Sequence, residues 1–346
     1  MKYSESLKLS VVMPCYNKPS YLIEMIKTIQ VQTLKNWELI LVDDGSDECN
    51  FRQVRDFIEN DDRIKLVKRD RLPKNGDTCR NIGMDMATGE YLIIFDSDDL
   101  VSNTCFEHRV AFMEKNPDCD YATFPSCSFV DGTNDYKPRK YDSSINNVLD
   151  YILNADYPFT VWGNIYRRSA VDKIRWDEKV FIYQDFDFMV QCELMGLKHR
   201  WFEAEYKDPD YFYRVFRNGN SVCAKVVTEH KVTSSNYLFM KIAHQLCDRS
   251  DGIHLMDLFF RFILLHFEQL LIEYKKEYVD GFLLIVKQIF PLQYEKMRKI
   301  AMIADKHKLT HFNLFRIYFS LYLSYKEPLH RTYMIHELAK CILMRK

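Results

Sequence analysis

Three aspartates stand within four residues at Asp96-Ser97-Asp98-Asp99, directly after the apolar run 91–95. Carboxylates placed so close together repel one another unless a positive charge joins them. A hard divalent cation that also binds a phosphate oxygen meets this need, so Asp96, Asp98 and Asp99 are candidate ligands of Mg²⁺ or Mn²⁺. The alternatives are a solvated turn or the start of a helix.

Two further polar clusters follow apolar runs, DDGS at 43–46 and PCYN at 14–17. A carboxylate such as Asp44 can accept the imide N–H of a uracil ring, and Tyr16 can stack on a base. The alternative for the first cluster is a turn closed by an aspartate side chain. For the second it is an ordinary strand-to-helix turn with Tyr16 as packing.

Arg80 lies in the string CRNIG at 79–83, just ahead of the strand that leads to the acidic run. A guanidinium can hold a diphosphate, or it can orient a carboxylate of a metal site. The alternative for Arg80 is an ordinary surface arginine.

The surrounding pattern predicts the elements that position these residues. Short β-branched runs predict buried strands at 9–14, 38–42, 64–67 and 91–95. Helical spacing predicts helices over 19–34, 50–60 and 77–87. This alternation predicts an α/β fold with a largely parallel, doubly wound sheet flanked by helices. Ligands bind beyond the carboxyl ends of strands in such sheets, and all three polar clusters follow strand ends.

Four strings, taken together and in order, resemble the family 2 glycosyltransferases with the GT-A fold. They are VVMPCYNK, ELILVDDGSDE, CRNIGMDMATGEYLIIFDSDD and YQDFDF. The agreement covers residues 9–99 and extends more loosely to position 220. The resemblance implies a nucleotide-diphospho-sugar donor, usually UDP-linked, and a divalent metal. It also implies transfer with inversion, by direct displacement at the anomeric carbon.

The resemblance assigns roles to the clustered residues. Asp44 would meet the uracil, and Tyr16 and Asn17 would line the nucleoside pocket. Asp96 would lie near the ribose and the metal, and Asp98 would be the principal metal carboxylate. The other residues that it implicates in donor or metal binding are Pro14, Asp43, Arg80, Ser97 and Asp99.

The resemblance also places the catalytic base further along the chain, at Asp185 in the string YQDFDF. Gln184 stands where the family usually has Glu, but the aspartate is kept. Apolar neighbours raise a carboxylate's pKa, and a general base needs only a partial rise. Asp187 is the competing candidate, and the alternative for Asp185 is a helix N-cap.

Two later segments resemble family stretches that contact substrate. Trp162 would stack on the acceptor sugar, with core packing as the alternative. Arg214 or Arg217, in a loop-like segment that begins at 211, would grip the donor phosphate, with an exposed-edge strand as the alternative. The Gln-x-x-Arg-Trp element of processive synthases is absent, which favours an enzyme that adds a single sugar.

Composition and charge describe the chain as a whole. The 346 residues carry a net charge of −1, but residues 225–346 hold 19 lysines and arginines against 12 acidic residues. Ten cysteines form no CxxC pair, which predicts free thiols in a reducing cytoplasm. The apolar runs are too short to span a bilayer, and the first residues lack a signal peptide. No nucleic-acid module is recognisable.

The sequence therefore predicts two domains. Residues 1–225 form a GT-A nucleotide-sugar-binding catalytic domain, and 226–346 form an α-helical region. We expect the basic helices to contact the inner membrane surface, an acceptor or a second subunit in a homodimer. The expected location is the cytoplasm.

The predicted function is metal-dependent, inverting glycosyl transfer from a UDP-sugar to a hydroxyl of a saccharide or lipid-linked oligosaccharide. This activity would serve surface polysaccharide biosynthesis, as a hexosyl- or N-acetylhexosaminyl-transferase. Two alternatives remain, a non-catalytic nucleotide-sugar-binding scaffold of the same fold and a sugar nucleotidyltransferase. The latter would need a Gly-rich phosphate loop near the first strand, and VVMPCYNKPS has none.

Overall fold

The structure is a computed structural model that describes residues 7–133, 135–138, 147–154, 160–202, 209–216, 228–272 and 275–307. The chain divides into two compact units, Met1–Ala224 and Lys225–Lys346.

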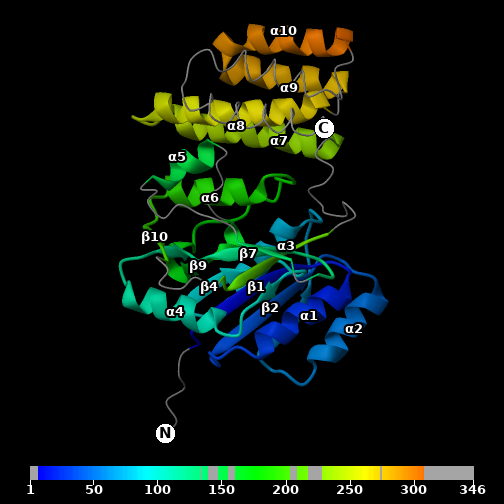
Figure 1. The fold of residues 1–346 in the computed structure, drawn as a ribbon, viewed down its shortest axis with the longest axis vertical. Helices are drawn as coiled ribbons and strands as arrows, with labels where there is room; N and C mark the ends of the chain where they lie inside the picture. The colour runs from blue at the N-terminus through cyan, green and yellow to red at the C-terminus, as the bar shows by residue number, and fades with distance from the viewer. Residues whose placement is uncertain are drawn as a thin grey trace. The chain divides into compact units, whose positions relative to one another are not determined.

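A seven-stranded sheet forms the centre of the first unit, in the order β10-β6-β9-β4-β1-β2-β3 (Figure 1). Its strands are β1 (Leu9–Cys15), β2 (Trp37–Asp43), β3 (Ile64–Lys68), β4 (Tyr91–Ile94), β6 (Tyr121–Thr123), β9 (Asn164–Arg167) and β10 (His199–Trp201). The pairs β1–β2, β1–β4, β2–β3 and β6–β10 are parallel, and only β9 runs antiparallel to its neighbours. The largely parallel sheet expected from the sequence is thereby confirmed.

Helices cover both faces of this sheet. They are α1 (Pro19–Gln30), α2 (Glu48–Ile58), α3 (Gly76–Met86), α4 (Cys105–Lys115) and α6 (Gln184–Leu194), and α5 (Val148–Leu153) packs against α6. Leu9, Val11 and Met13 of β1 share one core with residues of α1 and α4. Val12 points to the opposite face, where a Cβ placed on Gly83 of α3 would lie 2.4 Å from its Cγ1. Only glycine permits α3 to pack so closely on the central strand.

A four-stranded sheet stands beside the acidic run, in the order β5-β11-β7-β8. Its strands are β5 (Leu100–Val101), β7 (Ser126–Val130), β8 (Tyr136–Pro138) and β11 (Tyr211–Val215). Strand β5 begins directly after Asp99, and β11 pairs with it antiparallel, with Tyr211 opposite Val101. Residues that lie more than 110 positions after Asp99 in the sequence thereby contact the acidic run.

The second unit consists, in its described residues, of α7 (Glu229–Cys247), α8 (Gly252–Ile272), α9 (Lys276–Ile289) and α10 (Pro291–His307). Its core is aromatic, with Phe239 packed edge-on against Phe259, Phe262 and Phe282. The helical character expected for this region is confirmed as far as His307. None of the described helices combines the length and the apolar character needed to cross a bilayer.

Candidate active site

The loops that follow β1, β2 and β4 meet at one edge of the large sheet. Cys15 pairs in register with Asp43, and the backbone N–H of Asp44 donates to the carbonyl of Cys15 over 2.8 Å. The N–H of Phe95 donates to the carbonyl of Val12 over 3.0 Å. The three polar clusters predicted from the sequence therefore converge, because parallel neighbours end at the same edge.

Asn17 joins the first two of these loops. Its backbone N–H donates to Ser46 Oγ over 2.7 Å, and its Oδ1 accepts from Asp47 N and Asn50 Nδ2. Asn17 and the next residue, Lys18, both have a left-handed backbone with φ of 50°. The described contacts of the Asn17 side chain thus fix the shape of the loop that presents Tyr16.

Asp43 closes the second loop on itself. Its Oδ2 accepts from the backbone N–H groups of Gly45 and Ser46 at 3.0 and 2.9 Å. This is the turn that the sequence left open as an alternative, and it gives Asp43 a structural role. Pro14 is likewise part of β1, opposite Val42.

Asp44 belongs to the candidate nucleoside subsite predicted from the sequence. Arg69 donates from Nε to Asp44 Oδ1 over 2.7 Å. Burial raises the pKa of Asp44, while the hydrogen bond and charge of Arg69 oppose that rise. Tyr16 is 49% exposed, and the Lys74 ammonium lies 3.8 Å from its ring centroid. The subsite offers a carboxylate, a guanidinium and an aromatic face.

Asp96 and Asp98 form an acidic pair with partly exposed side chains, and Ser97 lies between them. Arg80 donates from Nη2 to Asp96 Oδ1 over 2.9 Å, and Lys18 Nζ lies 3.4 Å from Asp98 Oδ2. Burial raises the pKa of Asp98, and the charge of Asp96 adds to that rise. The two carboxylates therefore repel each other, and each has one cationic partner.

This pair fits a divalent cation shared with a diphosphate. Among the described residues, no group of three or more His, Cys, Asp or Glu side chains could hold a metal by itself. Mg²⁺ in phosphate-binding sites is commonly held by one or two carboxylates together with substrate phosphates and water. Asp96 and Asp98 supply two such hard oxygen ligands.

Asp99 is a correction to the predicted metal ligands. Its side chain is buried, its Oδ2 accepts from the Tyr211 hydroxyl over 2.6 Å, and its Oδ1 accepts from Arg214 N over 2.7 Å. Both oxygens are already bonded inside the protein, so Asp99 ties the acidic loop to β11.

Arg214 is a second correction, because its guanidinium does not reach out to grip a phosphate. It donates from Nε to the Asp98 carbonyl, from Nη1 to Asp131 Oδ1 and from Nη2 to Glu24 Oε2, at 2.6, 2.6 and 2.7 Å. Arg214 therefore holds the backbone of the acidic loop in place through the Asp98 carbonyl. Arg217 lies outside the described residues.

Asp185 lies in the first turn of α6, close to the acidic pair. The N-cap of this helix is Tyr183, with φ of 62°, so the N-cap alternative for Asp185 does not apply. Burial raises the pKa of Asp185 to about 6, with Arg80 lowering it and Asp96 raising it further. These couplings bring the predicted base, Arg80 and the acidic pair into one electrostatic cluster.

Asp187, the competing base, is buried, and its Oδ2 accepts from Gln191 Nε2 over 2.9 Å. Gln184, the departure from the family pattern, donates to the carbonyl of Val180 over 3.1 Å. The geometry therefore favours Asp185 over Asp187 as the proton acceptor.

Trp162 is a third correction. Its ring is 5% exposed and stacks on Tyr211 with centroids 4.7 Å apart and planes at 7°. Tyr213 stacks on it as well, at 5.5 Å. The core-packing alternative therefore holds, and Trp162 has little surface left for an acceptor sugar.

Asp77 is a residue of the site that the sequence reasoning missed. Arg80 donates from Nη1 to Asp77 Oδ1 over 2.9 Å, and the Arg80 guanidinium lies 4.5 Å from the Trp176 ring centroid. Burial raises the pKa of Asp77 to about 8. Its sequence signal was its position in the first turn of α3, three residues before Arg80.

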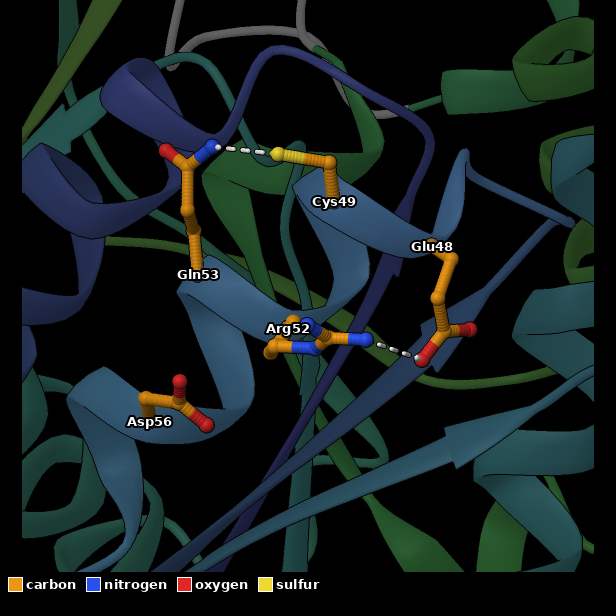
Figure 2. Close-up of a pocket in the computed structure, with 5 residues that line it drawn as sticks. All are labelled: Glu48, Cys49, Arg52, Gln53 and Asp56. Atoms are coloured by element: carbon orange, nitrogen blue, oxygen red, sulfur yellow. Dashed lines mark hydrogen bonds and ion pairs between the residues drawn. The ribbon is translucent and has the colours of Figure 1, made fainter.

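A shallow surface hollow lies elsewhere, on α2. Figure 2 shows the side chains that line it, namely Glu48, Cys49, Arg52, Gln53 and Asp56. All five come from one helix, and an Arg52–Glu48 ion pair of 3.8 Å spans part of it. None of the predicted site residues lies in this hollow.

The sheet and its acidic loop define a protein of the GT-A fold. Residues 10–175 match the family profile described as Glycosyl transferase family 2, which confirms the resemblance drawn from the sequence. It is similar to TarS of S. aureus, residues 1–349 in complex with UDP-GlcNAc, with a TM-score of 0.66 and 17% identity. This likeness of fold covers 92% of this chain and 91% of that one.

Two curated relatives share more sequence. Glycosyltransferase GlyG of Streptococcus pneumoniae is 39% identical over 55% of this chain and 59% of that protein. Amylovoran biosynthesis glycosyltransferase AmsB of Erwinia amylovora is 24% identical over 56% of this chain and 66% of that protein. The chain thus spans less than two thirds of the length of the first curated relatives that it matches.

Proposed function

We propose that this chain transfers a sugar from a UDP-sugar to a hydroxyl of a saccharide or lipid-linked oligosaccharide, with inversion at the anomeric carbon. The observation that carries the proposal is the cluster in which Arg80 bonds to Asp96 and acts electrostatically on Asp185. It sets a base of raised pKa beside an acidic pair, at the same edge of the sheet as Asp44 and Tyr16. These are the parts that direct displacement needs.

The proposed mechanism uses the described residues in three roles. Asp44, Arg69 and Tyr16 bind the base of the donor. A divalent cation held by Asp96 and Asp98 would neutralise the departing diphosphate. Asp185 takes the proton from the acceptor hydroxyl while that oxygen attacks the anomeric carbon. The bond from this carbon to the diphosphate breaks, and UDP leaves.

The choice of substrates is supported by the relatives. TarS has a similar fold and was crystallised with UDP-GlcNAc, which supports UDP as the nucleotide and a hexosyl or N-acetylhexosaminyl group as the sugar. AmsB is named for amylovoran biosynthesis, which supports an acceptor on a growing polysaccharide.

Thermal melting with UDP, GDP, CMP and ADP, each with and without Mn²⁺, tests the donor site. A ligand present at 100 times its Kd stabilises the folded state by about 2.7 kcal/mol. We expect a shift with UDP that requires Mn²⁺ and disappears in Asp98→Asn. A shift with GDP alone would contradict the UDP assignment, and no shift with any of the four nucleotides would contradict the proposed donor site.

A turnover assay separates the two enzyme classes. Incubation with UDP-sugars and candidate acceptors should release UDP and not pyrophosphate, since a nucleotidyltransferase releases pyrophosphate. Loss of UDP release in Asp185→Asn with retained UDP binding would support the proposed base.

We propose further that the second unit contacts an anionic membrane surface. Leu284, Leu292 and Met302 are exposed apolar side chains, and Lys287 and Lys296 are exposed cations on the same helices. Apolar and basic side chains together suit the interface of an anionic bilayer. Flotation of the whole protein with vesicles, with and without phosphatidylserine, tests this, and equal recovery from both would contradict it.

A further inference from the structure

Lys18 occupies a position that its own residue type disfavours. It has a left-handed backbone with φ of 50°. Among residues other than glycine this conformation is uncommon, and Asn, Asp and His adopt it more often than lysine does. It is also the N-cap of α1, where its side chain makes no capping hydrogen bond. A lysine has no acceptor atom for that purpose. Local helix and turn preferences therefore do not explain a lysine here, and such outliers gather at functional sites.

The turn aims the Lys18 side chain at the acidic pair. Asn17 is held by three hydrogen bonds, two to the second loop and one to Asn50 of α2, which fix the turn that Lys18 continues. The Lys18 ammonium lies 3.4 Å from Asp98 Oδ2 and 4.6 Å from the ring centroid of Phe216. Arg80 bonds to the other carboxylate of the pair, so each of the two carboxylates contacts one cation.

We propose that Lys18 is an internal counter-cation of the acidic pair. Its ammonium neutralises Asp98 in the metal-free protein, and a divalent cation must displace it in order to bind. This inference rests on the proposed function, because the metal at Asp96 and Asp98 belongs to that function. Lys18 thereby lowers the affinity of the nucleotide-free protein for metal.

This arrangement has a consequence for the order of binding. When a metal takes Asp98, the Lys18 ammonium loses its carboxylate partner at the place where the donor diphosphate arrives. A negatively charged phosphate can then take over that partnership. Metal and donor binding therefore favour each other.

Binding of Mn²⁺ alone, followed by electron paramagnetic resonance in the absence of nucleotide, tests the proposal. We expect Lys18→Met to bind Mn²⁺ about two- to fivefold more tightly than the wild type, the range that a solvent-exposed ion pair contributes. Lys18→Asn should do the same, since Asn tolerates the left-handed backbone. Wild-type or weaker affinity in both variants would overturn the proposal.

Lys27→Met is the matched control. It removes an equal charge from the same helix, and the Lys27 ammonium lies 5.7 Å from the Phe57 ring centroid. A similar gain in Lys27→Met would reduce the effect to net charge and overturn the specific role of Lys18.

Asp98→Asn separates this proposal from the proposed function. If wild-type binding is lost in Asp98→Asn but unchanged in Lys18→Met, the metal site stands and only the Lys18 inference falls. If the wild type binds no Mn²⁺ even in the presence of UDP, both fall. Equal melting temperatures across the variants will show that the fold is intact.

Discussion

Arg80 donates a hydrogen bond from Nη2 to Oδ1 of Asp96 over 2.9 Å and so ties helix α3 to the acidic loop. The same guanidinium bonds to Asp77 and lowers the pKa of Asp185. One buried cation therefore sets both the position of a proposed metal ligand and the basicity of the proposed base.

Replacing Arg80 should consequently lower kcat more than it weakens donor binding. Arg80→Lys keeps a charge but loses the planar fork that reaches two carboxylates at once. We expect kcat to fall about 100-fold, the loss that a displacement of the reacting groups by about 1 Å can cause. Arg175→Met is the control, since Arg175 bonds to the exposed Asp85. Equal kcat values for Arg80→Lys and the wild type in UDP release would contradict this role.

Asp185 should make kcat fall at acidic pH, which gives the pH–rate profile an acid limb. A base must be ionised to accept a proton, and the pKa of Asp185 is about 6. We therefore expect kcat to fall tenfold for each pH unit below 6 and to level off above it. Asp185→Asn should lower kcat by about 10²- to 10⁴-fold and abolish this limb. A pH–rate series with UDP release as the readout checks both.

Asp187→Asn supplies the comparison for this prediction. Asp187 is buried and accepts from Gln191, so its replacement should lower the melting temperature and leave the acid limb in place. If Asp187→Asn removes the limb and Asp185→Asn does not, the two roles must be exchanged.

The large sheet could be predicted because its strands are short apolar runs that end in polar clusters. The runs at 9–14 and 38–42 agree with β1 and β2 to within a residue at each end. Strand direction then follows from the helices between them. The convergence of the three polar clusters was therefore readable from local pattern alone.

Which aspartate of a cluster is buried and which is exposed could not be predicted in this way. Asp98 and Asp99 are adjacent in sequence, yet Asp98 is partly exposed and Asp99 is buried against Tyr211. That difference depends on β11, which arrives from more than 110 residues away. Arg214 was misassigned for the same reason, since its partner Glu24 lies 190 positions earlier.

Asp98→Asn and Asp99→Asn should separate metal binding from stability. Asp98 is partly exposed and faces Lys18, so Asp98→Asn should abolish Mn²⁺ binding with little change in melting temperature. Asp99→Asn weakens a buried acceptor of two hydrogen bonds, which should cost about 1–3 kcal/mol. Isothermal titration calorimetry measures the binding of Mn²⁺, and urea unfolding measures the change in stability. Loss of Mn²⁺ binding in a stable Asp99→Asn protein would restore Asp99 as a ligand.

Asp77 should make stability depend on pH. Its pKa is about 8 in the folded protein, against 3.8 for an ordinary aspartate, because burial disfavours the charge. The folded state then holds a proton that the unfolded state has released, so this contribution to stability falls as pH rises from about 4 to about 8. Asp77→Asn lacks this titration. We expect the melting temperature of the wild type to fall relative to Asp77→Asn over that window, and parallel curves would refute the assignment.

Arg69 should govern the affinity for the uracil base. It bonds to Asp44 and opposes the rise in pKa that burial causes there, so without it Asp44 would more readily take up a proton. A protonated Asp44 is a poor acceptor for an imide N–H, and a hydrogen bond to a charged group contributes about 1.5–3 kcal/mol. We therefore expect Arg69→Met to weaken UDP binding at pH 7 by at least tenfold, with part of the affinity regained at higher pH. Arg63→Met is the control, because Arg63 pairs with Asp61. Calorimetric titration with UDP measures the effect, and equal affinity of Arg69→Met and the wild type would show that Arg69 serves only the fold.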